Sequence, residues 1–157
     1  MYKELNEIFI PASDWVEMIL PLLNKGYELK ISPNGTSMLP FICGGRDEAV
    51  LIARTDIRLK RGDVVLYSRE DKTYVLHRIH HIKAGRIYML GDIQTWIEGP
   101  IEDENVVAVV KAFVRKGKYI SCHNFIYKLV TGLWLVLRPV RPFLWKHYCL
   151  IKKRLGG

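Results

Sequence analysis

Short β-branched runs separated by turn signals fill the chain between residues 47 and 121, and they constrain the fold more than any other feature. Glycine or clustered polar residues punctuate the runs, as at Arg61–Asp63, Ser68–Lys72 and Ala84–Gly85. This spacing is typical of antiparallel strands joined by tight turns, and it predicts a mainly β fold, a small coiled antiparallel β domain. We expect strands over these ranges: Tyr27–Ile31, Ala49–Ala53, Val64–Tyr67, Thr73–Ile82, Arg86–Leu90, Val106–Val114 and Tyr119–Ser121.

Two segments of different character flank the expected β domain, which we place at residues 31–121. Residues 1–30 carry an amphipathic pattern that predicts a short helix ending near Lys25, with Ser13 or Asp14 as its N-cap. Residues 122–157 form a hydrophobic, basic tail with helical character. The apolar run in this tail is shorter than the roughly 20 residues that cross a bilayer, which favours an interfacial segment.

Charge is distributed unevenly along the 157 residues. Residues 1–104 hold 13 Lys/Arg and 16 Asp/Glu, whereas residues 105–157 hold 11 Lys/Arg and no acid. A basic end of this kind predicts contact with an anionic partner. Its aromatic and aliphatic content favours lipid over nucleic acid, so we expect residues 122–157 to bind an anionic membrane surface, peripherally on the cytoplasmic face.

Neither the cysteines nor the histidines predict a metal or cofactor site. On a regular strand His77 and His81 share a face about 13 Å apart, and His80 points the other way, so one metal ion cannot bind two of them easily. No cleavable secretory signal is recognisable at the start of the chain. Three cysteines form neither a CxxC pair nor a disulfide framework, which favours a reducing setting: Cys43, Cys122 and Cys149.

The string Gly35–Pro40 is the motif most suited to chemistry. It sets Ser37 between a glycine-containing lead-in and a Met-x-Pro sequence, which predicts a turn with an accessible hydroxyl. Nucleophilic serine chemistry needs such a hydroxyl, a base within about 2.6–3.2 Å and donors for the developing oxyanion. An ordinary turn in a β domain is the alternative interpretation of the string alone.

Five strings between residues 35 and 113 form a pattern in a fixed order: "GTSMLPFI" (35–42), "LKRGDVVLY" (59–67), "VLHRIHHI" (75–82), "MLGD" (89–92) and "VVAVVKAF" (106–113). With these strings the chain resembles, over roughly residues 30–115, the serine peptidase clan that joins signal peptidase I with the self-cleaving LexA-type repressors. The resemblance implies the fold of that clan and peptide-bond hydrolysis without a cofactor.

The resemblance also implies the roles of individual residues. Ser37 corresponds to the nucleophile, and His77 takes the position of the general base. Most bacterial signal peptidases and the LexA group carry lysine there, whereas the endoplasmic-reticulum type of signal peptidase has histidine with an acidic helper. The helper corresponds to Asp92, which follows Gly91, and Glu98 is an alternative orienting acid.

The oxyanion hole is expected from backbone amides alone. A serine hydroxyl that assists the hole in many signal peptidases is replaced by Gly35. The donors are therefore assigned to the amides of Gly35, Thr36 and Ser37, as in the LexA group.

Since an imidazole has a pKa of about 6.5, cleavage with His77 as the base is expected to fall below about pH 6.

The function predicted from the sequence is a signal-peptidase-like serine endopeptidase that cleaves a peptide or protein precursor by a Ser-His dyad. Only 36 residues precede Ser37, and they are amphipathic rather than a membrane helix, which favours a specialised processing peptidase. Two alternatives remain open: a LexA-like regulatory protein and a catalytically inactive peptide-binding scaffold.

Overall fold

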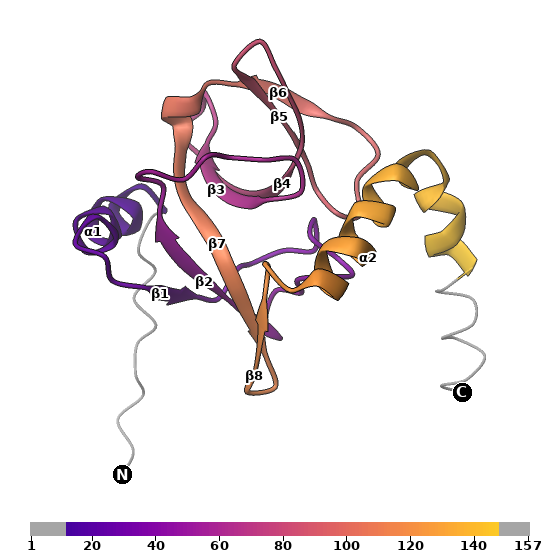
Figure 1. Ribbon diagram of the computed structural model, residues 1–157, viewed down its shortest axis with the longest axis horizontal. Coiled ribbons are helices and arrows are strands. Elements are labelled where there is room, and N and C mark those ends of the chain that lie inside the picture. The colour runs from indigo at the N-terminus through magenta and orange to yellow at the C-terminus, as the bar shows by residue number, and fades with distance from the viewer. Residues whose placement is uncertain (1–11, 148–157) are drawn as a thin grey trace.

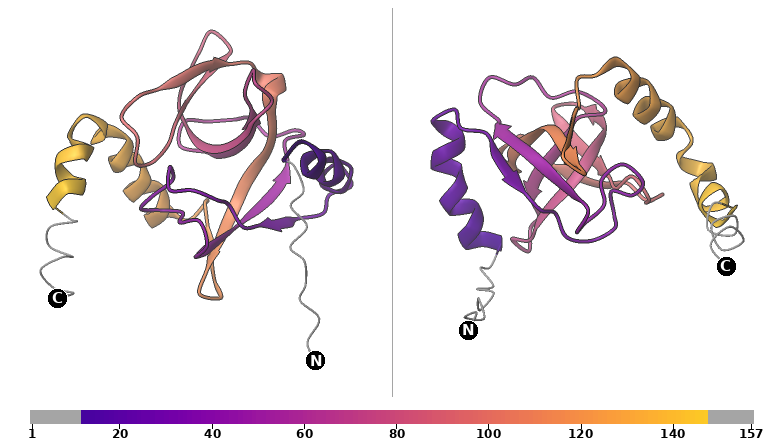
Figure 2. Two further views of the ribbon diagram at one scale, coloured as in Figure 1. Left: turned by 180° about the vertical axis from the view of Figure 1, so that it is seen from behind. Right: turned by 90° about the horizontal axis from the view of Figure 1, so that it is seen from below.

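The computed structural model describes residues 12–147, which form a coiled antiparallel sheet with helices on two opposite sides (Figures 1 and 2). Seven strands follow the order β1-β2-β7-β3-β4-β5-β6, and the eighth, β8, pairs with β7. The prediction of a mainly β fold is confirmed. The strand bounds are as follows: β1 Leu29–Ile31, β2 Asp47–Ala53, β3 Val64–Ser68, β4 Tyr74–Lys83, β5 Arg86–Leu90, β6 Glu98–Ile101, β7 Val106–Arg115 and β8 Lys118–Ser121.

The edge strand β6 is the one strand that the sequence analysis did not predict. It contains Gly99 and Pro100, both unfavourable inside a strand, and Gly99 has a positive φ of 131°. In the sheet order β6 pairs with β5 alone, and an edge position tolerates a proline because no ladder hydrogen bond is lost there. The 3-10 turn η1, Asp103–Asn105, then leads into β7.

Side chains alternate between the two faces of β3 and β4, and each face contributes to a separate apolar cluster. The first cluster takes Leu66 and Leu76 and includes the buried face of the N-terminal helix α1, Ala12–Asn24, formed by Val16, Ile19 and Leu23. The second cluster takes residues of the opposite alternation: Val65, Tyr67 and Ile79, with Met89 from β5. The predicted helix is therefore present and packs on the sheet, with Pro21 inside it. The expected N-cap is wrong, because Ser13 and Asp14 both lie within the helix.

Helical structure follows β8. The Asn124 side chain caps helix α2, Phe125–Val136, by accepting hydrogen bonds from the N–H groups of Ile126 and Tyr127 at 2.9 and 3.2 Å. The 3-10 turn η2, Arg138–Val140, joins α2 to a further helical stretch at residues 141–147. No helix within residues 12–147 is long and apolar enough to cross a membrane. Cys149 and the basic residues 152–154 lie outside the described residues.

Candidate active site

Ser37 lies in a tight turn between β1 and β2, as the sequence predicted. The Leu39 N–H donates to the Thr36 carbonyl at 3.0 Å, and the Ile42 N–H donates to the Met38 carbonyl at 2.9 Å. Met38 is buried in the first apolar cluster, whereas Ser37 is only half-buried. The turn is thus anchored beside the serine while the serine side chain retains contact with solvent.

Two glycines permit the close packing of this turn. The Gly44 N–H donates to the Gly35 carbonyl at 3.3 Å, and a Cβ on Gly44 would lie only 2.7 Å from that same oxygen. A Cβ on Gly91 would lie 2.8 Å from the Ser37 carbonyl oxygen. That oxygen accepts a 3.0 Å hydrogen bond from the N–H of Ile93. The Ser37 backbone is therefore held against the loop that follows β5.

The strand register relates this contact to His77 on β4. Arg78 pairs with Leu90 and Ile79 with Met89, so one further step of the same register brings Gly91 beside His77. The contact between Ser37 and Gly91 thus brings the serine turn to the part of the sheet that carries the histidine. A cavity of about 210 Å³ opens between the turn and the start of β4, lined in part by Ser37, Met38, Tyr74 and Leu76. Within residues 12–147 no hydrogen bond joins Ser37 to His77, as is common for catalytic pairs without substrate.

The backbone N–H groups of the turn are available as donors. The carbonyls of Gly35, Thr36 and Ser37 each accept a backbone hydrogen bond. In contrast, no N–H group from Gly35 to Met38 donates to another protein group in the described part of the chain. Such unpaired amides beside a serine hydroxyl are the donors that an oxyanion hole requires. The predicted amides of Gly35, Thr36 and Ser37 belong to this set.

His77 is buried, with 1% of its surface exposed, and its Nδ1 atom faces two oxygen-bearing groups. The Tyr67 hydroxyl lies 3.2 Å from Nδ1, and Oε2 of Glu98 lies 3.8 Å from it. Arg69 holds Glu98 by two hydrogen bonds of 2.5 and 2.6 Å, and this pairing lowers the pKa of the Glu98 carboxyl. The ionised Glu98 favours the tautomer with the proton on Nδ1, which leaves Nε2 as a proton acceptor.

Burial controls the protonation of His77. It lowers the pKa of the imidazole to about 4; the Glu98 charge raises that pKa, Arg69 lowers it and Asp92 raises it to a smaller extent. The imidazole is therefore neutral at pH 7, the state that a general base needs. Of the two acids named from the sequence, Glu98 has the stronger influence on the histidine.

Asp92 has a different partner from the one that the sequence predicts. Its two carboxylate oxygens accept hydrogen bonds of 2.8 and 2.7 Å from Arg78, and neither side chain of this pair is exposed. Within the described residues it makes no hydrogen bond to His77. The Asp92 carbonyl also accepts from the Trp134 indole N–H at 2.6 Å, so the residue joins the loop after β5 to α2.

A β-bulge overturns the expected arrangement of the other histidines. The β4–β5 register shifts between Ile79 and His81, so His80 is an extra residue without a partner in the ladder. The rings of His80 and His81 meet instead of lying on opposite faces, with their Nδ1 atoms 2.8 Å apart. No group of three His, Cys, Asp or Glu side chains in residues 12–147 is arranged to hold a metal ion.

Tyr67 and Arg69 are site residues that the sequence analysis did not identify. Val65 pairs with His77 across β3 and β4, so Tyr67, two residues further along β3, shares the face of the histidine. Register and alternation could have found it once the two strands were paired. Arg69 lies in the turn after β3, and no sequence pattern indicates its contact with Glu98.

No protein-family model and no curated protein matches this chain. The assignment of chemistry therefore rests on the residues and their geometry.

The low pKa of His77 predicts an acid-tolerant pH profile for peptide cleavage. Because the neutral imidazole persists down to about pH 4, we expect kcat/KM to stay level from pH 7 to pH 5 and to fall only near pH 4. This corrects the expectation of a loss below pH 6, which assumed a solvated histidine. NMR titration of the His77 imidazole should give a midpoint near pH 4 as well. Glu98→Gln should lower that midpoint further, because the Glu98 charge raises the pKa of His77. A midpoint above pH 6 in the free protein would contradict the burial argument.

A methyl group at Gly91 is expected to displace Ser37. Its Cβ would lie 2.8 Å from the Ser37 carbonyl, so Gly91→Ala should shift the turn and reduce kcat by about a hundredfold. The matched control is Gly132→Ala on α2, where an added Cβ meets nothing within 4 Å. Steady-state cleavage of one peptide by both variants is the measurement. Equal kcat values for the two variants would show that the Gly91 contact does not position Ser37.

Proposed function

We propose that this protein is a serine endopeptidase with the fold of the signal peptidase and LexA clan, and that Ser37 and His77 are its catalytic dyad. The observation that supports the proposal most is the 3.0 Å hydrogen bond from the Ile93 N–H to the Ser37 carbonyl, beside the strand of His77. The fold assignment is supported by where the resembling strings lie: they fall on the Ser37 turn, β3, β4, the end of β5 and β7.

The proposed reaction begins with attack of the Ser37 Oγ on the scissile carbonyl carbon. His77 Nε2 accepts the hydroxyl proton, and the backbone N–H groups of residues 35–37 donate to the resulting oxyanion. The C–N bond then breaks as the imidazolium returns the proton to the departing amine, leaving an acyl-serine. A water molecule, deprotonated by the same imidazole, attacks the ester and restores free Ser37.

Glu98, Tyr67 and Arg69 are positioning residues in this mechanism. The ionised Glu98 and the Tyr67 oxygen attract the Nδ1 proton of His77, so the lone pair of Nε2 stays available. When the imidazole gains a second proton, the Glu98 charge stabilises it. Arg69 keeps Glu98 ionised and fixed. Asp92 acts further away, because its carboxylate is paired with Arg78.

The substrate proposed is a peptide or protein precursor with small side chains before the cleaved bond. The cavity beside Ser37 measures about 210 Å³, less than the several hundred Å³ of a typical small-molecule site. Its boundaries include Met38, Ile42 and Leu76, which are apolar and buried. A cavity of this size and lining favours one or two short apolar side chains, which is also the preference that the resemblance implies.

A peptide library of mixed sequence tests the proposal without knowledge of the natural substrate. Wild type should generate new peptide ends, identified by mass spectrometry, and His77→Ala should generate none above background. His81→Ala is the matched control, because His81 stacks on Tyr88 with ring centroids 4.3 Å apart and has no role in the dyad. Peptides that bind to wild type but remain intact would favour the inactive peptide-binding scaffold instead.

A further inference from the structure

Helix α2 presents an unpartnered apolar face that occupies about half of its circumference. At 3.6 residues per turn its exposed apolar residues all lie on the side opposite the sheet. Leu129 and Leu133 are 61% and 60% exposed, values otherwise typical of charged residues. The exposed apolar residues of α2 are Phe125, Ile126, Leu129, Val130, Leu133 and Val136, and Val140 and Phe143 beyond the helix are exposed as well. We call this set the α2 face.

The inward side of the same helix is bonded to the loop that contacts Ser37. Trp134 donates to the Asp92 carbonyl, and Arg141 donates to the carbonyls of Gly91 and Gln94 at 3.2 and 2.8 Å. Trp134 therefore faces the protein and is not part of the exposed α2 face. These bonds fix the orientation of the α2 face relative to the candidate active site.

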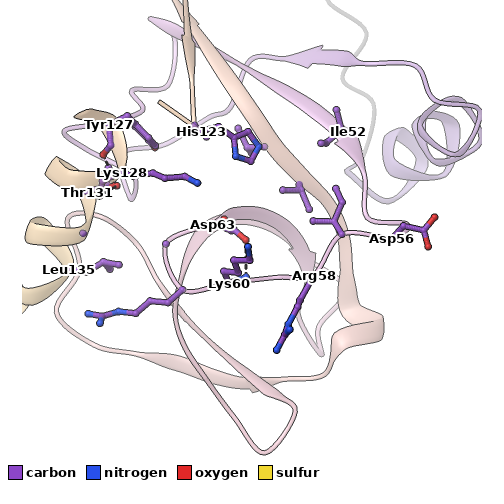
Figure 3. Close-up of a pocket in the computed structure, with 17 residues that line it drawn as sticks. Ile52, Asp56, Arg58, Lys60, Asp63, His123, Tyr127, Lys128, Thr131 and Leu135 are labelled. Atoms are coloured by element: carbon purple, nitrogen blue, oxygen red, sulfur yellow. Dashed lines mark hydrogen bonds between the residues drawn. The ribbon is translucent and has the colours of Figure 1, made fainter. Parts of the chain in front are cut away.

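The segment that carries the α2 face is basic and contains no acid. Residues 105–157 contain 11 Lys/Arg and no Asp or Glu. Lys128 projects from the edge of α2 into a cavity of about 650 Å³ between the helix and the sheet (Figure 3). Arg58, Lys60 and Arg61 line the same cavity, together with Asp56 and Asp63, on the side of α2 that faces the sheet. The segment that carries the α2 face therefore combines exposed apolar side chains with an excess of positive charge.

We infer that the α2 face docks on an anionic lipid bilayer, with α2 lying in the plane of the interface. Its apolar residues enter the boundary between headgroups and acyl chains, while Lys128 at the edge of α2 and other cations of the acid-free segment contact lipid phosphates. A second copy of the chain fits less well, because facing α2 helices would bring lysines and arginines together without acids from the tail to pair with them. This inference is independent of the proposed peptidase activity.

Flotation of the full chain with vesicles tests the inference. Wild type should float with vesicles of three parts phosphatidylcholine to one part phosphatidylglycerol, and less with phosphatidylcholine alone. Leu133→Glu should lower the bound fraction at least about tenfold, because it replaces a leucine that would enter the bilayer with a charge that the anionic lipids repel. Met18→Glu on α1 is the matched control, since Met18 is 61% exposed and Leu133 is 60% exposed.

Thermal melting of both variants checks that each keeps the fold, which is expected because both side chains are exposed in the wild type. Three results would overturn the inference. The first is failure of wild type to float with the anionic vesicles, and the second is equal flotation of the two variants. The third is a wild-type dimer that Leu133→Glu converts to a monomer without any vesicle binding, because a second copy would then be the occupant of the α2 face.

Discussion

Replacement of Ser37 by alanine is expected to reduce peptide cleavage by about 10⁴-fold or more while leaving the fold intact. The change removes the only atom that forms the acyl-enzyme, and losses of this order follow when a nucleophile is deleted from a serine peptidase. Ser37 is half-buried and its hydroxyl makes no hydrogen bond within residues 12–147. Its loss should therefore change the free energy of unfolding by less than about 0.5 kcal/mol.

Ser32→Ala provides the matched control for this variant. Ser32 is exposed and lies between β1 and the Ser37 turn. Ser32→Ala therefore also removes a serine hydroxyl, but at a position outside the candidate site. Initial rates on one library-derived peptide, with thermal melting of all three proteins, complete the measurement. Retention of wild-type rates by Ser37→Ala would exclude this serine as the nucleophile.

The second large effect concerns stability. Arg78→Gln should lower the free energy of unfolding by about 3–5 kcal/mol, because it leaves the Asp92 carboxylate buried without its cationic partner. Arg78 also donates to the Gly62 carbonyl at 2.8 Å and to the Tyr127 hydroxyl at 3.0 Å, so two further groups lose a donor. Chemical denaturation with a spectroscopic readout of the tryptophans measures the loss.

Arg86→Gln separates the effect of burial from the effect of charge. Arg86 pairs with Glu102 at 3.5 Å, but both side chains are more than half exposed, so its replacement should change stability by less than about 1 kcal/mol. Arg78→Met combined with Asp92→Leu should recover part of the loss, because it removes both buried charges. Equal destabilisation by Arg78→Gln and Arg86→Gln would contradict the structural role of the buried pair.

Most of the sheet could be predicted because its β-branched runs are bounded by glycine or polar turns. The expected run Arg86–Leu90 matches β5 at both ends, and the run Val106–Val114 differs from β7 by one residue. Strand β6 was missed because local propensity at Gly99 and Pro100 opposes a strand. Its formation depends on pairing with β5, a tertiary contact that no local pattern records.

The candidate site was predictable to a different degree at each residue. Ser37 was named from a local turn motif, whereas His77 and the two acids were named from the resemblance to the peptidase clan. The choice between Asp92 and Glu98 depends on which acid meets the imidazole, and that is decided by the fold. Asp92 follows β5 and turns toward Arg78, on the face of β4 opposite His77, whereas β6 brings Glu98 to Nδ1. His77 and Arg78 are neighbours on β4, so their side chains point to opposite faces, and each meets a different acid. The acid beside the histidine, Glu98, comes from β6, the strand that the sequence did not predict.

The measurement that tests the central claim most directly is covalent labelling with a serine-reactive phosphonate probe, followed by peptide mapping. If Ser37 is the nucleophile and His77 its base, the adduct should map to Ser37 and disappear in both Ser37→Ala and His77→Ala. Labelling should persist at pH 5 and decline near pH 4, because the pKa of His77 is lowered to about 4. An adduct on another serine, or Ser37 labelling that is unchanged in His77→Ala, would contradict the proposed dyad.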